Sequence, residues 1–277
     1  MIPGARAPIS VFEVGAGAPV LVLHGFPDHA RGMASIAHAI AASGGRAIVP
    51  ALPGYLPSPL PPDGDVSVAR VAEDLVAVLD ALGVAEAAVV GHDWGALLAY
   101  DLGARHERRI TRVVGVAAPH PAGFRVRRRV LREQQTAVYA WLLAFAKSGP
   151  ELAADPVWLT QLLQFWSPGL RRDDWDEVLA LLAQPEVAAA VCRWYRCDLE
   201  SDDVLGDVLV PATVIHGAQD GCIGPAVFLG TDDRFAAGVR RITLPEAGHW
   251  PHLEAPAEVL PMIVDALGLR ADRHECR

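Results

Sequence analysis

Runs of apolar residues bounded by turn residues alternate along the first 120 positions with segments whose apolar residues repeat at helical spacing. Such alternation is typical of a mostly parallel sheet covered by helices. The expected strands of this part are 19–25, 46–51, 85–93 and 111–119. Helices are expected at 66–83, ending on a glycine, and from Trp94 to about Arg105.

The pattern changes after Pro121. From about 122 to 205 the apolar residues keep helical spacing, and no strand-like run interrupts them. The remaining expected elements are strands at 211–217 and 240–246 and a helix at about 255–267. We therefore expect a core domain formed by residues 1–121 and 206–277, interrupted by an all-helical lid at 122–205.

Composition limits the classes of partner. The net charge of −9 over 277 residues disfavours nucleic acid. The basic run at 124–133 therefore indicates a solvated helix face. Although 52% of the residues are hydrophobic, no apolar run reaches the ~18 residues that a membrane span requires. The first ten residues lack the apolar stretch of a signal peptide. We expect neither a nucleic-acid nor a membrane partner.

The cysteines and histidines predict no metal or cofactor site. The four cysteines form no Cys-x-x-Cys pair, and their density is too low for a disulfide scaffold: Cys192, Cys197, Cys222 and Cys276. They are interpreted as reduced thiols of a cytoplasmic protein. No cluster of His, Cys and Asp has metal-ligand spacing, and no Gly-rich phosphate loop occurs.

The segment Gly91-His92-Asp93-Trp94-Gly95 has the spacing of a nucleophile elbow, Gly-x-Ser-x-Gly, with Asp93 in place of serine. Two later segments carry its expected partners. Asp220 follows the strand at 211–217, and His249 lies in the loop after the last strand. The chain order nucleophile, acid, histidine is that of hydrolases built on a strand–elbow–helix unit.

The motifs HGFP, GHDWG, APHP, WYR, HGAQDGCIGP and GHWPHLE together resemble the α/β-hydrolase-fold enzymes of the epoxide hydrolase and haloalkane dehalogenase branch, from about Ser10 to Leu267. The resemblance implies an α/β fold with a mostly parallel central sheet flanked by helices. It also implies a helical lid inserted after the sixth strand, an aspartate nucleophile and no cofactor.

A carboxylate nucleophile is already ionised at neutral pH and needs no base to activate it. Asp93 can therefore displace a leaving group at an alkyl carbon and form an ester on the enzyme. Water activated by His249, which Asp220 orients, would hydrolyse this ester. The backbone N–H groups of Phe26 and Trp94 are expected to form the oxyanion hole.

The leaving group separates the two activities of this branch. Opening an epoxide produces an alkoxide, which needs a proton donor such as tyrosine. The resemblance implies two such donors in the lid, Tyr195 of the WYR motif and Tyr139. A halide needs only N–H donors, and Phe26 offers no side-chain donor for one.

The leading expectation is an epoxide hydrolase that converts small apolar epoxides and water to vicinal diols, with Phe26, Trp94 and Trp141 lining the substrate site. A haloalkane-type dehalogenase, another hydrolytic enzyme on the same scaffold, and a ligand-binding protein without turnover remain as alternatives. A homodimer is left open as the assembly.

Overall fold

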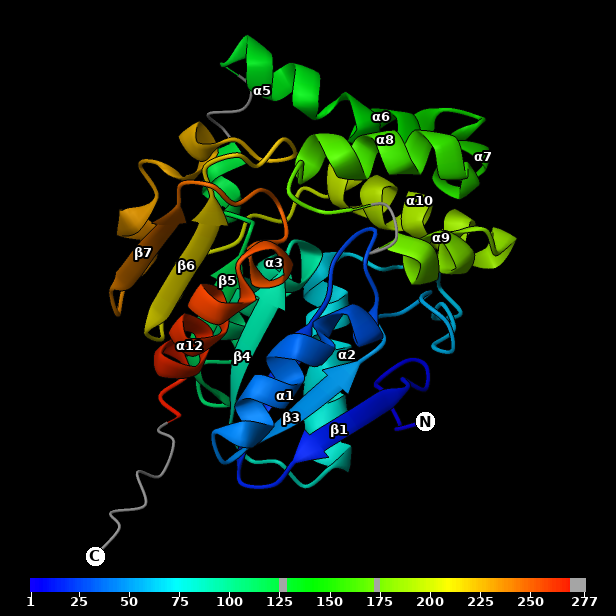
Figure 1. Ribbon diagram of the computed structural model, residues 1–277. Coiled ribbons are helices and arrows are strands. Elements are labelled where there is room, and N and C mark those ends of the chain that lie inside the picture. Colours follow the sequence, from blue (N-terminus) through cyan, green and yellow to red (C-terminus); the bar gives the residue numbers. More distant parts are fainter. Residues whose placement is uncertain (125–128, 172–174, 270–277) are drawn as a thin grey trace, which may run out of the picture.

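The computed structural model describes residues 1–124, 129–171 and 175–269, and its strands form one seven-stranded sheet (Figure 1). The strand order is β1-β3-β2-β4-β5-β6-β7, and β1 alone runs antiparallel to its neighbour. The strands are β1 Val11–Gly15, β2 Ala18–Leu23, β3 Gly45–Pro50, β4 Ala87–His92, β5 Ile110–Val116, β6 Ala212–Gly217 and β7 Val239–Leu244.

Helices cover both faces of the sheet, and a further group of helices lies over its carboxyl edge (Figure 1). The core helices are α1 Ala34–Ala42, α2 Val68–Ala81, α3 Trp94–Arg105, α11 Pro251–Glu254 and α12 Pro256–Ala266. Those of the lid are α5 Leu131–Thr136, α6 Val138–Phe145, α7 Gly149–Ala154, α8 Pro156–Trp166, α9 Asp176–Leu182 and α10 Pro185–Glu200.

Alternation along the buried strands divides the core between the two faces, because successive side chains of a strand point in opposite directions. In β2, Val20 and Val22 pack with α1 and α12, whereas Leu21 and Leu23 belong to the cluster that contains α2, α3 and the inner side of the lid. The apolar runs of the sequence thus have both faces covered, as expected of a parallel sheet.

The sequence-based assignment locates the expected strands and helices to within about three residues at each end. It omits β1 and α1. Five strands precede the lid in the described residues, one fewer than the resemblance implies. The segment before β1 makes only an isolated antiparallel bridge between Ile2 and Ile9, so no further strand forms there.

Some features predicted from the sequence fall on residues that the structure does not describe. Part of the basic run, residues 125–128, lies outside the described residues, as do the tail 270–277 and its Cys276. The other three cysteines are free thiols. Among the helices that are described, none has the length and apolar character needed to cross a bilayer.

Candidate active site

Asp93 occupies the sharp turn between β4 and α3, where its backbone adopts φ 53° and ψ −115°. Positive φ is costly for a residue with a side chain, and it is typical of a nucleophile held up above the end of a sheet. Gly91 and Gly95 make this turn possible. A Cβ on Gly91 would overlap the backbone of Gly95, and a Cβ on Gly95 would overlap the Leu23 carbonyl.

The loop after β2 reaches the Asp93 carboxylate. The Phe26 N–H donates a hydrogen bond of 2.8 Å to Oδ1 of Asp93, which is the contact expected of one oxyanion donor. The Phe26–Pro27 peptide bond is cis. Trp94 begins α3 directly after the nucleophile, and its side chain is 6% exposed.

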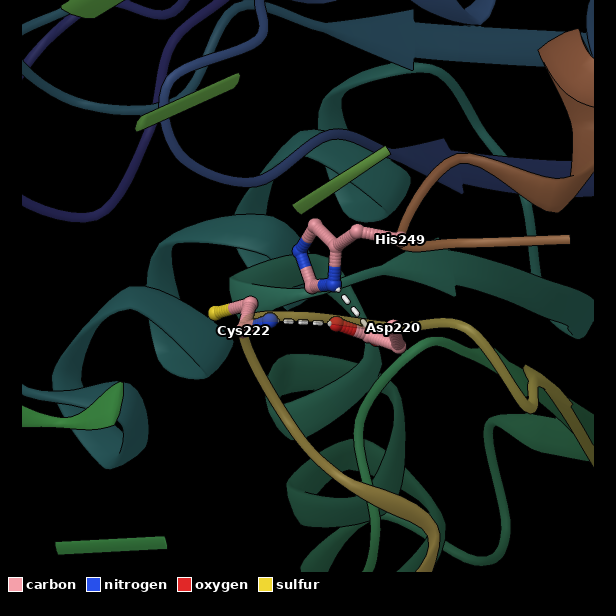
Figure 2. Close-up of side chains that lie close together, drawn as sticks. All are labelled: Asp220, Cys222 and His249. Carbon is pink, nitrogen blue, oxygen red and sulfur yellow. Dashed lines mark hydrogen bonds and ion pairs between the residues drawn. The ribbon is translucent and has the colours of Figure 1, made fainter. Parts of the chain in front are cut away.

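His249 and Asp220 form a buried acid–base pair. Nδ1 of His249 lies 2.8 Å from Oδ2 of Asp220, and Oδ1 of Asp220 accepts a hydrogen bond from the Cys222 N–H at 2.7 Å (Figure 2). The same oxygen accepts a second hydrogen bond from the Ile223 N–H at 2.9 Å. Because Nδ1 faces Asp220, Nε2 faces the nucleophile, 3.6 Å from Oδ2 of Asp93. The structure thus brings together the three residues that the motifs predict.

The charges of this group determine its protonation. Burial alone would lower the pKa of His249, but its hydrogen bond and ion pair with Asp220, together with the nearby Asp93 carboxylate, raise that pKa to about 10. Burial alone would raise the pKa of Asp93, but the neighbouring His249 and the Phe26 N–H lower it. At neutral pH the site therefore holds a protonated His249 beside an ionised Asp93.

Two lid helices place their tyrosines opposite the elbow. Tyr139 on α6 and Tyr195 on α10 meet edge to face, with ring centroids 5.6 Å apart. The Tyr195 ring also packs against Phe26 (5.5 Å) and Trp94 (5.2 Å). Burial, with Tyr139 and the Asp93 charge beside it, raises the pKa of Tyr195 well above its usual value, so its hydroxyl keeps its proton.

The expectation that Trp141 lines the site is wrong. Its side chain is 58% exposed and packs against Phe145 on the outer side of α6. The helical period explains this, since a residue two positions after the buried Tyr139 points to nearly the opposite side of the helix. Trp166 is instead the tryptophan that the lid adds to the site, with its ring centroid 4.8 Å from Tyr139 and 5.3 Å from His249.

Sequence reasoning also missed two contacts of the catalytic loops. His92 points away from the nucleophile, as its place on the strand predicts, but its Nε2 lies 2.8 Å from the carbonyl oxygen of His249. Burial lowers the pKa of His92 to about 3, so it is neutral and donates this bond. Sγ of Cys222 lies 3.3 Å from the Tyr139 hydroxyl. No local spacing signals either contact, because their partners lie far apart in the sequence.

Asp220, Cys222 and His249 each carry an atom able to bind a metal ion, and these atoms lie within 4.8 Å of one another. In the structure, however, the carboxylate and the imidazole bind each other, and the backbone N–H groups of the same loop hold the second carboxylate oxygen. This arrangement orients a general base.

Comparison with known proteins places this geometry in a family. Residues 18–256 match the family model described as the alpha/beta hydrolase fold. Over 308 aligned residues the chain is 26% identical to epoxide hydrolase A of Mycobacterium tuberculosis, covering 94% of each protein. A stretch of 112 residues, 40% of this chain, is 39% identical to an epoxide hydrolase of Caballeronia sordidicola but spans only 34% of that protein.

Solved structures agree on the fold. An epoxide hydrolase mutant from Bacillus megaterium superimposes with a TM-score of 0.81 at 21% identity, covering 96% of this chain and 99% of that one. Together with the seven-stranded sheet, the elbow at Asp93 and the family match over most of the chain, this shows that the chain belongs to the alpha/beta hydrolase fold family.

Proposed function

We propose that this protein is an epoxide hydrolase that opens small apolar epoxides to vicinal diols through an ester on Asp93. One observation carries the proposal. An ionised Asp93 lies beside a buried His249–Asp220 pair, and two buried lid tyrosines pack over the same elbow. Relatives described as epoxide hydrolases support the same activity.

In the first step a carboxylate oxygen of Asp93 attacks an epoxide carbon, and the C–O bond of the ring breaks. The oxygen that leaves gains negative charge and takes a proton from a lid tyrosine, Tyr195 or Tyr139. Ester formation also removes the negative charge of Asp93. Only Asp220 then holds the proton on His249, so the pKa of His249 falls, and the proton that it releases replaces the one that the tyrosine gave.

In the second step the neutral His249 takes a proton from water, and the resulting hydroxide attacks the ester carbon of Asp93. The Phe26 N–H, which already donates a hydrogen bond to Oδ1, stabilises the negative charge that develops on the carbonyl oxygen of the ester. The bond from the ester carbon to the alkyl oxygen breaks, the leaving alkoxide takes the proton that the hydroxide brought to the Asp93 carboxyl group, and the diol leaves. The cycle ends with Asp93 ionised and His249 protonated, as it began.

The intact mass of a His249→Gln variant tests this mechanism. Without the base, Asp93 can still be alkylated but its ester cannot be hydrolysed, so exposure to a panel of epoxides should add the whole mass of one epoxide, located on Asp93. The double variant Asp93→Asn/His249→Gln is the matched control and should gain nothing.

Two other results would contradict the proposal. A mass gain equal to an alkyl group without its halogen, after exposure to alkyl halides only, would assign a dehalogenase. No adduct from either panel, together with saturable binding and no product in the wild type, would assign a ligand-binding protein.

A further inference from the structure

The carboxyl end of lid helix α8 contacts both loops that carry the acid–base pair. The carbonyl oxygen of Trp166, the last residue of α8, accepts hydrogen bonds from the N–H groups of His249 (3.0 Å) and Gly221 (3.3 Å), and Gly221 directly follows Asp220. The last carbonyl groups of a helix have no partner within it. Here the Trp166 carbonyl, at the end of a lid helix, binds both the loop that carries His249 and the loop that carries Asp220.

The next residue extends this contact. The buried Ser167 hydroxyl donates to Oε1 of Glu254 (2.7 Å) and accepts from the Trp250 N–H (3.1 Å). The Glu254 carboxylate in turn accepts from the N–H groups of Gly248 (3.0 and 2.9 Å) and Trp250 (3.2 Å). Glu254 thus holds the residues on both sides of the catalytic histidine, and Ser167 joins Glu254 to the lid.

Glycines allow these backbones to approach so closely. A Cβ on Gly248 would lie 2.6 Å from the Trp166 carbonyl oxygen, and a Cβ on Gly221 would overlap the carbonyl of Phe165. Both clashes are with backbone atoms, which cannot turn aside as a side chain can. The two catalytic loops therefore have a glycine at each point where the end of α8 rests on them.

We propose that the carboxyl end of α8 holds His249 in its working position, with Ser167 and Glu254 as positioning residues that act through the histidine loop. A lid that lifted at this end would release the base, so α8 stays docked on the catalytic loops during turnover. The expected kinetic effect rests on the function proposed above, and the position of the imidazole does not.

Ser167→Ala separates the two chemical steps. The hydrogen bonds that the described chain gives Ser167 and Glu254 do not include Asp93, so the rate of ester formation should change by less than about twofold. Hydrolysis of the ester needs the aligned base, and a misplacement of the order of 1 Å should slow it by about 10- to 100-fold. The ester should then accumulate in intact-mass measurements of the turning-over enzyme. Ser167→Thr, which keeps the hydroxyl, should restore hydrolysis.

Thr160→Ala is the matched control, because it removes a hydroxyl from the same helix whose bond, to the Pro156 carbonyl, stays within α8. A readout without substrate is the titration of the His249 ring followed by NMR. Ser167→Ala should lower the apparent pKa of His249 by about one unit, as expected if the ring moves away from Asp220, and Thr160→Ala should leave it unchanged.

Unchanged titration and unchanged hydrolysis in Ser167→Ala would overturn the positioning role. If the wild type turns over no epoxide, the proposed function fails, while the titration still decides the inference about α8. If circular dichroism finds Ser167→Ala unfolded, Glu254→Gln provides the same test. This variant keeps the shape of the side chain and removes the negative charge that binds the backbone on both sides of His249.

Discussion

At the scale of single residues, the site depends on charges that burial would otherwise suppress. His249 is completely buried, yet it holds a proton because Asp220 bonds it on one side and Asp93 lies 3.6 Å away on the other. Neither carboxylate can be reached freely by water, since their residues are 7% and 3% exposed. The proton on His249 and the negative charge on Asp93 therefore stabilise each other.

This ionisation makes stability depend on pH. The pKa of His249 is about 10 in the folded protein and about 6.5 in an unfolded chain. Its contribution to the free energy of unfolding is therefore complete below pH 6.5 and is lost as the pH rises toward 10. Urea unfolding of wild type and His249→Gln should give a larger stability difference at pH 6 than at pH 9.5. An equal difference at both pH values would contradict the ionised state.

At the scale of elements, α6 and α10 bring to the site what the core cannot supply. The core carries Asp93, Asp220 and His249 on loops at the ends of its strands, whereas the proposed proton donors lie on two lid helices that pack against each other. The exposed side of α6 faces away from the core and carries Trp141, Leu142 and Phe145. A single helix thus presents the proposed donor Tyr139 inward and an apolar face outward.

Removing the hydroxyls of Tyr139 and Tyr195 should slow the opening of epoxides. Tyr195→Phe and Tyr139→Phe are each expected to lower kcat for epoxide opening by about 10- to 100-fold, and the double variant by about 1000-fold or more, because the alkoxide then lacks a donor. Steady-state kinetics with diol detection measures this.

Tyr100→Phe is the control for that series. Tyr100, which lies on α3, is also buried, but its hydroxyl donates to the Ala118 carbonyl at 2.8 Å. Its loss should cost stability and leave kcat within about twofold. Full activity in the Tyr139→Phe/Tyr195→Phe double variant would exclude both residues as donors.

At the scale of the whole molecule, contacts between distant segments fix the start of the chain on the core. The Arg6 side chain, 10% exposed, binds Asp74 on α2 (2.6 Å) and the Asp65 carbonyl (2.6 Å), and the Asp74 side chain is 2% exposed. Its side-chain bonds, which include one to Asp63, span 57 or more positions of sequence. They hold the segment before β1 against the face that α2 covers.

Arg6→Ala should lower the free energy of unfolding by about 2 to 4 kcal/mol, because it leaves the Asp74 carboxylate buried without its partner. Arg70→Ala, which breaks an exposed pair with Glu73 on the same helix, is the control and should cost less than about 0.5 kcal/mol. Urea unfolding followed by circular dichroism compares them. Equal losses of unfolding free energy in the two variants would mean that the burial of Asp74 does not determine the effect of removing Arg6.

The sequence by itself determined the features that local spacing encodes. Apolar runs set the strands, and the glycines of GHDWG are required by the backbone of the elbow that carries Asp93. The motifs that contain Asp220 and His249 follow strands whose carboxyl ends meet at one edge of a parallel sheet, so they could be grouped before any coordinates were known.

Only the tertiary structure decided which lid side chains reach that edge. It turned Trp141 outward and Trp166 inward, and it joined Ser167 to Glu254 across 87 positions. Helical spacing tells which residues share a side of a helix, but the direction in which that side faces depends on how the helix packs against segments far away in the sequence. The elbow follows from local sterics, whereas the alignment of the base under α8 exists only in the folded chain.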